Sequence, residues 1–398
     1  MATRTATDEE MLDLALLTSA ELSAVTSAAA GRPVENPVAR ATPISYDWGS
    51  PATAGLWRVE VCDGQDADSV SYTYFVKLLR HVRLWPLLAQ LPDEASREEF
   101  IDFFPWRVEL EMYESGIAAV LPPGMRMPVL HHAKYADADH IALWWEFVAE
   151  RPGPWWPADY QQAAYLLGQL AARRRDGAAI NRELPPVMRD PHPGGSSLRY
   201  YTERRVLRGM LPALQDGRIW SHPVVAAGLR RAADPALPEA LLGLGRRIPR
   251  ILDVLDALPQ THAHGDASPQ NLLLPASEPG TVVVIDWGFG SLLPVGFDLG
   301  QLLVGLASAG QTDATELPDI DAVIFPAYLD GLAADGYGVE PAVVRTGYIG
   351  GLAARSALCT LPVEMLGAAA PTEEITELLA QRLRLARVLV DMAAAIAI

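Results

Sequence analysis

The sequence predicts a two-lobed α+β protein, with a small lobe that holds a mixed β-sheet and a larger lobe that is mostly helical. A chain of 398 residues, half of them apolar, is longer than one ordinary single-core domain and suits two lobes that share a cleft. Short strand-like segments fall in the first 148 residues, whereas helical spacing dominates after residue 157. We therefore expect an N-terminal helical extension over residues 1–40, a small lobe over 41–148 and a helical large lobe over 149–398.

The composition argues against several classes of protein. The net charge of -17, from 32 basic and 49 acidic residues, disfavours a nucleic-acid partner because phosphate backbones require clustered lysine and arginine. No apolar run approaches the roughly 18 residues that a membrane helix needs, and the acidic N-terminus does not resemble a secretory signal. Cys62 and Cys359 make neither a disulfide framework nor a metal-ligand pattern. We expect a cytoplasmic protein with no nucleic-acid or membrane partner, and its oligomeric state stays open.

The N-terminal part of the chain alternates between helix and strand signals. Thr7 and Glu10 predict a capping box, and the apolar spacing from Met11 to Leu22 predicts one or two amphipathic helices. Two strand-like segments on either side of the turn-like stretch Asp63–Asp68 predict a β-hairpin. These strands are Leu56–Val61 and Tyr72–Leu79, and they are followed by a helix over Arg97–Ser115 and a buried strand over Ile141–Val148.

From Pro157 onward the pattern is mostly helical, with one β-rich island. The island consists of two short segments, Asn271–Leu274 and Thr281–Ile285, joined by a turn. No internal repeat or low-complexity segment is present. The predicted helices are Ala163–Arg174, Leu198–Leu214, Pro238–Ala257 and long stretches from Asp319 to the C-terminus.

The residues that bear on chemistry gather around this island. The stretch that begins at His264 reads HGDASPQN, so Asn271 follows Asp266 by five positions, and the second strand leads into Asp286 within IDWGFG. Phosphoryl transfer needs a carboxylate that orients the attacking hydroxyl, together with an amide oxygen and a second carboxylate that hold Mg²⁺ against the phosphates. Asp266, Asn271 and Asp286 supply these groups in order, because a short loop and the following strand bring them to one edge of a hairpin.

A purely structural interpretation accounts for the same residues singly. Asp266 would cap a turn, Asn271 would support that turn, and Asp286 would mark the end of a buried strand. This interpretation gives no reason for the three to occur together at these offsets. We therefore favour a catalytic role for Asp266 and a metal-binding role for the other two.

The phosphate-binding half of such a site is expected upstream. The chain has only two lysines, and one of them, Lys77, follows the apolar run Tyr72–Val76. A strand lysine of this kind pairs with the α- and β-phosphates of a nucleotide and is braced by a glutamate on a helix. Glu109 is the favoured brace, because Glu111, two positions further, would face elsewhere on a helix. The alternative for Lys77 is a solvated lysine at a strand edge.

The rest of the nucleotide site is less specific. The stretch WGSPATAGLWR, residues 48–58, lacks a G-x-G-x-x-G pattern, but its glycines and the hydroxyls of Ser50 and Thr53 suit a phosphate-covering loop. An ordinary hairpin turn is the alternative. The strand that runs through Glu146 and Val148 offers backbone donors and acceptors for the base where the lobes join. ATP and GTP both stay open as the phosphoryl donor.

With these residues in place, the chain resembles the aminoglycoside phosphotransferase and choline kinase superfamily, the small-molecule relatives of protein kinases. HGDASPQN stands where that family has HGD-x-x-x-x-N, and IDWGFG stands where it has a strand followed by Asp-x-Gly or Asp-x-Ala. The resemblance runs from about Ser50 to the C-terminus. It implies a bilobal protein-kinase-like fold and nucleotide-dependent O-phosphorylation with Mg²⁺. It also implies that Asp298 braces the catalytic loop by accepting backbone hydrogen bonds and that His264 positions this loop.

Two positions depart from the relatives. Ser268 stands where many of them carry histidine, and Trp287 replaces the phenylalanine that is familiar from protein kinases. Neither change removes a ligand. The chain also lacks the HRD arginine and an Ala-Pro-Glu segment after Asp286, which argues against a protein kinase.

The acceptor pocket is expected between the segment Asp190–Leu258 and the C-terminal helices. A run of acidic residues in the C-terminal part would complement a cationic antibiotic or an amino sugar, and a solvated face is the alternative. This run contains Asp313, Glu316, Asp319 and Asp321, of which the first three are our candidates for substrate binding.

Three functions follow from the sequence. We favour an O-phosphotransferase that modifies an antibiotic, such as an aminoglycoside, a nucleoside or a related natural product, in resistance or self-resistance. The first alternative is a kinase for a sugar, an amino alcohol or a choline-like metabolite, and the second is a non-catalytic nucleotide-binding module. Intact Lys77, Asp266, Asn271 and Asp286 argue against this last alternative, because a decayed site would lose at least one of them.

Overall fold

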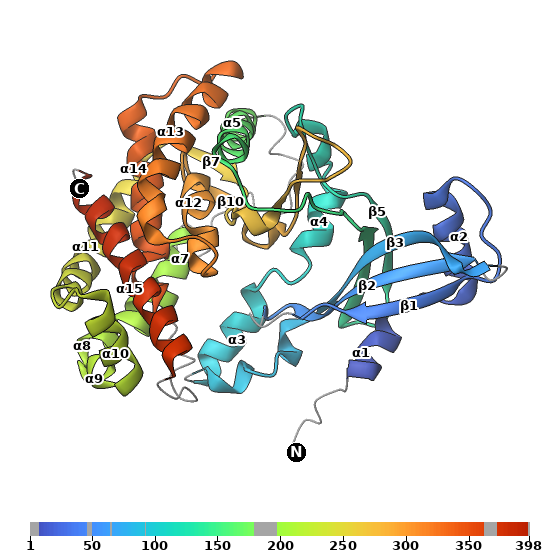
Figure 1. The fold of residues 1–398 in the computed structure, drawn as a ribbon, viewed down its shortest axis with the longest axis horizontal. Coiled ribbons are helices and arrows are strands. Elements are labelled where there is room, and N and C mark those ends of the chain that lie inside the picture. The colour runs from blue at the N-terminus through green and yellow to red at the C-terminus, as the bar shows by residue number, and fades with distance from the viewer. Residues whose placement is uncertain are drawn as a thin grey trace.

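The chain folds into a β-rich lobe and a larger helical lobe that lie side by side (Figure 1). In this computed structural model the β-rich lobe comes from the N-terminal part of the chain, and most of the helices belong to the other lobe. The α+β fold class predicted from the sequence is confirmed. The structure describes residues 8–45, 50–63, 66–91, 93–178, 197–361 and 372–396.

The small lobe is built on a five-stranded antiparallel sheet with the order β1-β2-β3-β6-β5. β3 is the central strand, and Lys77 within it lies opposite Leu56 on one side and Leu143 on the other. The predicted hairpin corresponds to β2 and β3, and residues 64 and 65 of its predicted turn lie outside the described residues. The strands are β1 (Val38–Pro43), β2 (Thr53–Asp63), β3 (Asp66–Arg80), β5 (Leu130–Tyr135) and β6 (His140–Glu146).

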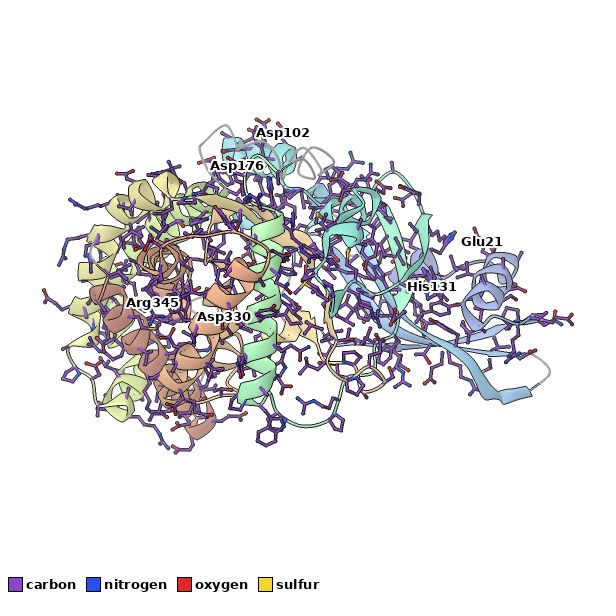
Figure 2. All side chains as sticks on the ribbon, turned by 90° about the horizontal axis from the view of Figure 1, so that it is seen from above. Glu21, Asp102, His131, Asp176, Asp330 and Arg345 are labelled. Carbon is purple, nitrogen blue, oxygen red and sulfur yellow. The ribbon has the colours of Figure 1, made fainter. Side chains whose placement is uncertain are left out.

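Two N-terminal helices, α1 (Asp8–Ala15) and α2 (Ser19–Ala30), pack against this sheet, and Thr7, the predicted cap, lies outside the described residues. Burial of apolar side chains between them and the sheet stabilises the contact. Trp144 donates from Nε1 to the Ala15 carbonyl at 3.0 Å. Figure 2 shows Glu21 of α2 and His131 of β5 at the same end of the molecule. The N-terminal extension therefore forms a layer of the small lobe.

The predicted helix over Arg97–Ser115 is wrong as one element, because the structure has two helices there. They are α3 (Glu94–Phe103) and α4 (Val108–Glu114). Pro105 separates them, since a proline disfavours helical backbone in the residue before it and lacks an N–H; Phe104 is extended, with ψ of 120°. α4 packs against the sheet through Leu110 and contributes Val108 and Met112 to the core of the large lobe. It therefore lies between the two lobes.

The large lobe contains the predicted helices, and the helix predicted over Leu198–Leu214 includes a π-helical segment. Residues 190–196 of the segment expected to shape the acceptor pocket lie outside the described residues. Among the helices described, none combines the length and the apolar character that crossing a bilayer would require. The helices are α5 (Pro157–Arg173), α7 (Ser197–Tyr201), the π-helix η5 (Thr202–Met210), α8 (Leu211–Gln215), α9 (Arg218–Ser221), α10 (Pro223–Ala232), α11 (Leu237–Ala257), α12 (Asp298–Ser308), α13 (Leu317–Ala334), α14 (Pro341–Arg355) and α15 (Glu373–Ala394).

The β-rich island of the large lobe forms two small sheets. β8 (Leu272–Leu273) and β9 (Val282–Val284) are antiparallel, as predicted, and β4 (Met125–Arg126) adds to β9 in parallel. A second pair, β7 (Gln260–Ala263) with β10 (Ser291–Pro294), was not predicted. The chain around β4 therefore runs along the large lobe before it returns to the small-lobe sheet. This arrangement places the loop between β7 and β8 next to the residue that follows β9.

Candidate active site

The loop between β7 and β8 brings Asp266 and Asn271 together. A short 3-10 turn over Pro269–Asn271 closes the loop, with Ser268 N–H donating to the Asp266 carbonyl at 2.7 Å. Nδ2 of Asn271 then donates to the carbonyl oxygen of Asp266 at 2.9 Å and to its Oδ2 at 3.2 Å. The spacing of five positions noted in the sequence therefore corresponds to a direct contact.

Two residues before Asp266 fix the start of this loop. Gly265 has a φ of +80°, and a Cβ at this position would lie 2.1 Å from the carbonyl oxygen of Phe289, so only glycine fits. His264 is fully buried, and its Nε2 bonds to the Ile285 carbonyl at 2.8 Å. Its Nδ1 accepts from the N–H of Asp266 at 3.2 Å. These two contacts assign a neutral imidazole with its proton on Nε2.

A buried carboxylate, that of Asp298, supports the loop between β7 and β8. Asp298, the first residue of α12, accepts hydrogen bonds from the backbone N–H groups of His264 at 3.0 Å and Gly265 at 2.8 Å. Burial raises the pKa of Asp298, while the two N–H donors and Arg174 oppose that shift. Arg174 is fully buried, and burial lowers its pKa while Asp298 opposes the shift. Its guanidinium lies 5.5 Å from the centre of the Trp287 ring, which contacts His264 in turn.

Asp286 follows β9 in the left-handed backbone region, with a φ of 56°. Residues other than glycine rarely adopt this region, and strained backbone of this kind concentrates at functional sites. The N–H of Ile285, just before it, donates to the Asn271 carbonyl at 3.0 Å, so the two chain segments are tied together. Gly288 leaves room beside the carboxylate, since a Cβ there would come within 3.3 Å of Asp286 Oδ1.

The upstream half of the site is an ion pair between β3 and α4. Nζ of Lys77 donates to Oε1 of Glu109, and both side chains are nearly buried. Burial raises the pKa of Glu109; the charge of Asp286 raises it further, and Lys77 opposes both effects. α4, which carries Glu109, packs beside the 3-10 turn Trp287–Phe289 that directly follows Asp286, so the two halves of the site face each other. Glu111 has a different charge neighbour, Arg107.

Ser50 and Thr53 lie where the chain enters β2, next to the central strand. The N–H of Thr53 donates to the Ser50 carbonyl at 3.2 Å, and Thr53 is buried and pairs with Leu79 of β3. Gly49, one of the two glycines of the predicted phosphate-covering loop, lies outside the described residues. The contact of either hydroxyl with phosphate stays a prediction.

Glu146 and Val148 lie where the chain leaves β6 for the large lobe. The carboxylate of Glu146 accepts from Arg126 at 2.7 Å and from the N–H of Val129 at 2.9 Å. Arg126 also binds Glu278 of the large lobe at 2.6 Å, so this side chain ties the lobes together. Because the Glu146 carboxylate is already bound by Arg126 and Val129, it is the backbone groups of this segment that suit a nucleotide base. Val148 is half-buried, and its role stays a prediction.

The three acidic residues proposed for substrate binding lie in the 3-10 turn that precedes α13 and in the first turn of α13 itself. Asp313 and Glu316 form a capping box, in which Asp313 Oδ1 accepts from Thr315 N–H at 2.9 Å and Glu316 accepts from Asp313 N–H at 3.3 Å. Asp319 is in the first turn of α13. Helix capping accounts for the first two residues locally, and their contact with an acceptor stays a prediction.

Arg355, the last residue of α14, is the functional candidate that sequence reasoning missed. Its Nη2 donates to Oδ1 of Asp266 at 3.0 Å, and its Nη1 donates to the Gly265 carbonyl. The two paired residues are 89 positions apart, so the contact cannot be predicted from local spacing in the sequence. A basic residue in the last turn of a helix is common for electrostatic reasons alone.

The residues present fit a magnesium ion held partly by the nucleotide. Among the described residues, no group of three or more His, Cys, Asp or Glu side chains is arranged to hold a metal. Mg²⁺, however, usually takes one or two protein ligands and completes its shell with phosphates and water. Asp286 offers a carboxylate, and Asn271 offers Oδ1, because its Nδ2 is engaged with Asp266.

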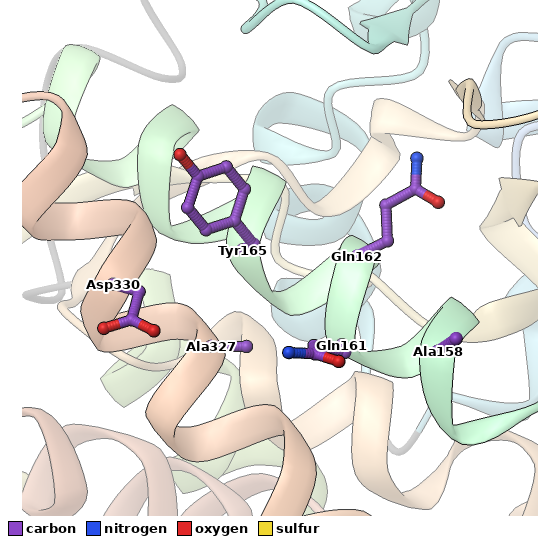
Figure 3. Close-up of a pocket in the computed structure, with 6 residues that line it drawn as sticks. All are labelled: Ala158, Gln161, Gln162, Tyr165, Ala327 and Asp330. Carbon is purple, nitrogen blue, oxygen red and sulfur yellow. The ribbon is translucent and has the colours of Figure 1, made fainter.

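A hollow of about 260 Å³ lies elsewhere, between α5 and α13 (Figure 3). None of the residues predicted for the site lines it, and we assign it no role. Its lining residues are Ala158, Gln161, Gln162, Tyr165, Ala327 and Asp330.

Comparison with known families decides the class of the protein. The model of the phosphotransferase enzyme family matches residues 116–334, which is more than half of the chain. The chain belongs to this family. The resemblance drawn from HGDASPQN and IDWGFG is thereby confirmed, and this phosphotransferase acts on a hydroxyl group of a small molecule.

Several solved structures are similar to this phosphotransferase, whereas no curated protein matches it. An aminoglycoside phosphotransferase from Alicyclobacillus acidocaldarius is 16% identical, with a TM-score of 0.47, over 89% of this chain and 91% of that one. A spectinomycin phosphotransferase in complex with AMP is 12% identical, with a TM-score of 0.47, over 96% and 99%. The ethanolamine kinase of Plasmodium vivax is 12% identical, with a TM-score of 0.46, over 88% and 82%. The family assignment rests on the family match and not on these structures.

Proposed function

We propose that this phosphotransferase moves the γ-phosphoryl group of ATP or GTP to a hydroxyl of an antibiotic, in the presence of Mg²⁺. The observation that supports this proposal is the convergence of three chain segments on one place. Asp266 and Asn271 are in direct contact, Lys77 and Glu109 form an ion pair, and the helix that carries Glu109 packs beside the turn that directly follows Asp286.

Each of these residues suits one part of the transfer. Lys77 neutralises the α- and β-phosphates, and Glu109 keeps its ammonium group in place. Asn271 Oδ1 and the Asp286 carboxylate would hold Mg²⁺, which supplies charge neutralisation between the β- and γ-phosphates when it is bound. Asp266 accepts a hydrogen bond from the acceptor hydroxyl and orients its oxygen for in-line attack on the γ-phosphorus. The bond from phosphorus to the β-γ bridging oxygen breaks as the new P–O bond forms, the nucleoside diphosphate leaves, and the hydroxyl proton passes to the Asp266 carboxylate.

The two lobes have different roles in this proposal. Residues 41–148 would bind the nucleotide, and residues 149–398 would carry the catalytic loop and the acceptor pocket. Membership of the phosphotransferase family supports transfer to a hydroxyl of a small molecule. For that molecule we propose an antibiotic such as an aminoglycoside, a nucleoside or a related natural product. A metabolite acceptor remains the alternative, and the experiment below separates the two.

The test is transfer from ATP and from GTP, with Mg²⁺, to a panel that contains kanamycin, puromycin, glucosamine and choline. We expect one antibiotic to raise nucleotide turnover and to gain the mass of one phosphoryl group. Asp266→Ala should lower that transfer at least about tenfold and leave nucleotide binding intact. Phosphorylation of choline or glucosamine alone would favour the metabolite kinase. Nucleotide binding without any turnover would favour a non-catalytic module and would contradict the proposal.

A further inference from the structure

Arg355 reaches the proposed catalytic carboxylate from a distant part of the chain. It ends α14, and its guanidinium donates to Asp266 Oδ1 at 3.0 Å and to the neighbouring carbonyl of Gly265. Only 12% of its side chain is exposed. A mostly desolvated guanidinium that binds two acceptors in its own plane has little freedom to reorient. The contact is therefore a fixed part of the catalytic loop's surroundings.

Three aromatic rings surround this guanidinium. Its Cζ lies 4.8 Å from the ring centre of Phe289 and 5.9 Å from those of Tyr201 and Phe297. Phe289 belongs to the segment after β9, Tyr201 ends α7, and Phe297 directly precedes α12. Aromatic faces attract a cation and exclude water from it. They therefore keep Arg355 pointed at Asp266.

The carboxylate of Asp266 is held at both oxygens as a result. Arg355 binds Oδ1, and Nδ2 of Asn271 lies 3.2 Å from Oδ2. An aspartate side chain held at one oxygen alone turns easily about its last bond, since that torsion has a broad energy minimum. Two anchors on opposite oxygens remove this freedom. An oxygen that must meet the acceptor hydroxyl in one geometry benefits directly from such restraint.

We propose that Arg355 is a positioning residue for Asp266. Its guanidinium holds the carboxylate in the rotamer that receives the acceptor hydroxyl, and it acts on transfer only through this carboxylate. The inference rests on the proposed function, in which Asp266 orients the acceptor. A purely structural role for Arg355, as a cation at the C-terminal end of α14, predicts a loss of stability without a selective loss of turnover.

The test compares Arg355→Ala and Arg355→Lys with Arg345→Ala in the full chain. Arg345 is a matched control, because it lies on the same helix, pairs with Asp321 at 2.5 Å and stacks on Phe325 at 4.4 Å. The readouts are the melting temperature, the KM for Mg–ATP, and ADP release from ATP both with water as the acceptor and with each compound of the panel.

We expect Arg355→Ala to lower kcat about 10- to 100-fold, the range for loss of one charge-assisted contact, with the KM for ATP unchanged. Arg355→Lys should recover only part of this loss, because an ammonium cannot bind both acceptors in one plane. Guanidinium ion added to Arg355→Ala should restore some turnover. Arg345→Ala should lower the melting temperature without a comparable change in kcat.

A double variant that carries Arg355→Ala and Asp266→Ala distinguishes failure of the positioning role from failure of the proposed function, on which this inference rests. If Arg355 acts through Asp266, the double variant should be no slower than Asp266→Ala alone. Equal kcat values for Arg355→Ala and Arg345→Ala, full recovery by lysine, or a further loss in the double variant would each overturn the positioning role. If Asp266→Ala itself turned over normally, the proposed function would fail, and Arg355 would have no catalytic group to position.

Discussion

The buried support of the loop between β7 and β8 gives a quantitative prediction for Asp298→Asn. This substitution keeps the shape of the side chain but removes its charge and one of its two acceptors. One backbone N–H of His264 or Gly265 loses its partner, at about 1–3 kcal/mol, and the fully buried Arg174 loses an opposing charge. We expect the free energy of unfolding to fall by about 3–5 kcal/mol in total.

The size of the expected melting shift follows from the length of the chain. With an unfolding entropy of about 2.1 cal/mol/K per residue, 398 residues give roughly 1.2 °C per kcal/mol, so the melting temperature should fall by about 4–6 °C. Displacement of the loop should also lower kcat by about 10-fold or more. Scanning calorimetry and transfer kinetics measure the two effects.

Asp335→Asn is the matched control for this experiment. Asp335 binds Arg173 through two hydrogen bonds of 2.9 and 3.2 Å in the same lobe, but both side chains are partly exposed. Its loss should cost no more than about 1 kcal/mol. If both variants melted at the same temperature with unchanged kcat, Asp298 would not support the loop through its bonds to His264 and Gly265.

Three further predictions concern other parts of the site. Lys77→Ala should lower kcat/KM for the nucleotide about 100-fold, whereas Lys134→Ala, the substitution of the only other lysine, should leave kinetics unchanged; equal effects would contradict a phosphate role. Gly265→Ala should abolish transfer and lower the melting temperature, since its Cβ would lie 2.1 Å from a carbonyl oxygen, and normal activity would refute the tight packing. The pKa of Glu278 lies below its usual 4.5 because Arg126 donates hydrogen bonds to it, so its stabilising effect is present above pH 4.5 and is lost on acidification. The melting temperatures of the wild type and Glu278→Gln should converge as the pH falls; a constant difference would argue against this linkage.

Two contacts of the site were predicted from the sequence, one from the short spacing between its residues and one from the chemistry of a strand lysine. Asp266 and Asn271 are five positions apart, and one turn brings them into contact. Lys77 and Glu109 were paired through a general property of strand lysines in nucleotide sites, and the structure places them in an ion pair. Both residues lie outside the stretch that the family model matches, so the residue pattern carried information that the match does not.

The contacts that were not predicted depend on packing between distant segments. Arg355 meets Asp266 only because α14 ends beside the catalytic loop, and nothing in the local sequence encodes that approach. Arg126 likewise engages Glu146, a residue expected near the base, through a parallel pair of short strands. The single helix predicted over Arg97–Ser115 failed for a simpler reason, since the effect of Pro105 on its neighbour outweighed the helical spacing.

The packing of α1 and α2 on the sheet also has a consequence during synthesis of the chain. Both helices are synthesised well before Trp144, whose indole binds the Ala15 carbonyl and which is 129 positions further along. At about 5–20 residues per second, synthesis needs roughly 6–26 s to reach this partner. During that interval the apolar side chains of both helices have an incomplete surface to cover them. Nascent chains of this protein should therefore be clients of chaperones that bind exposed apolar helices early in translation.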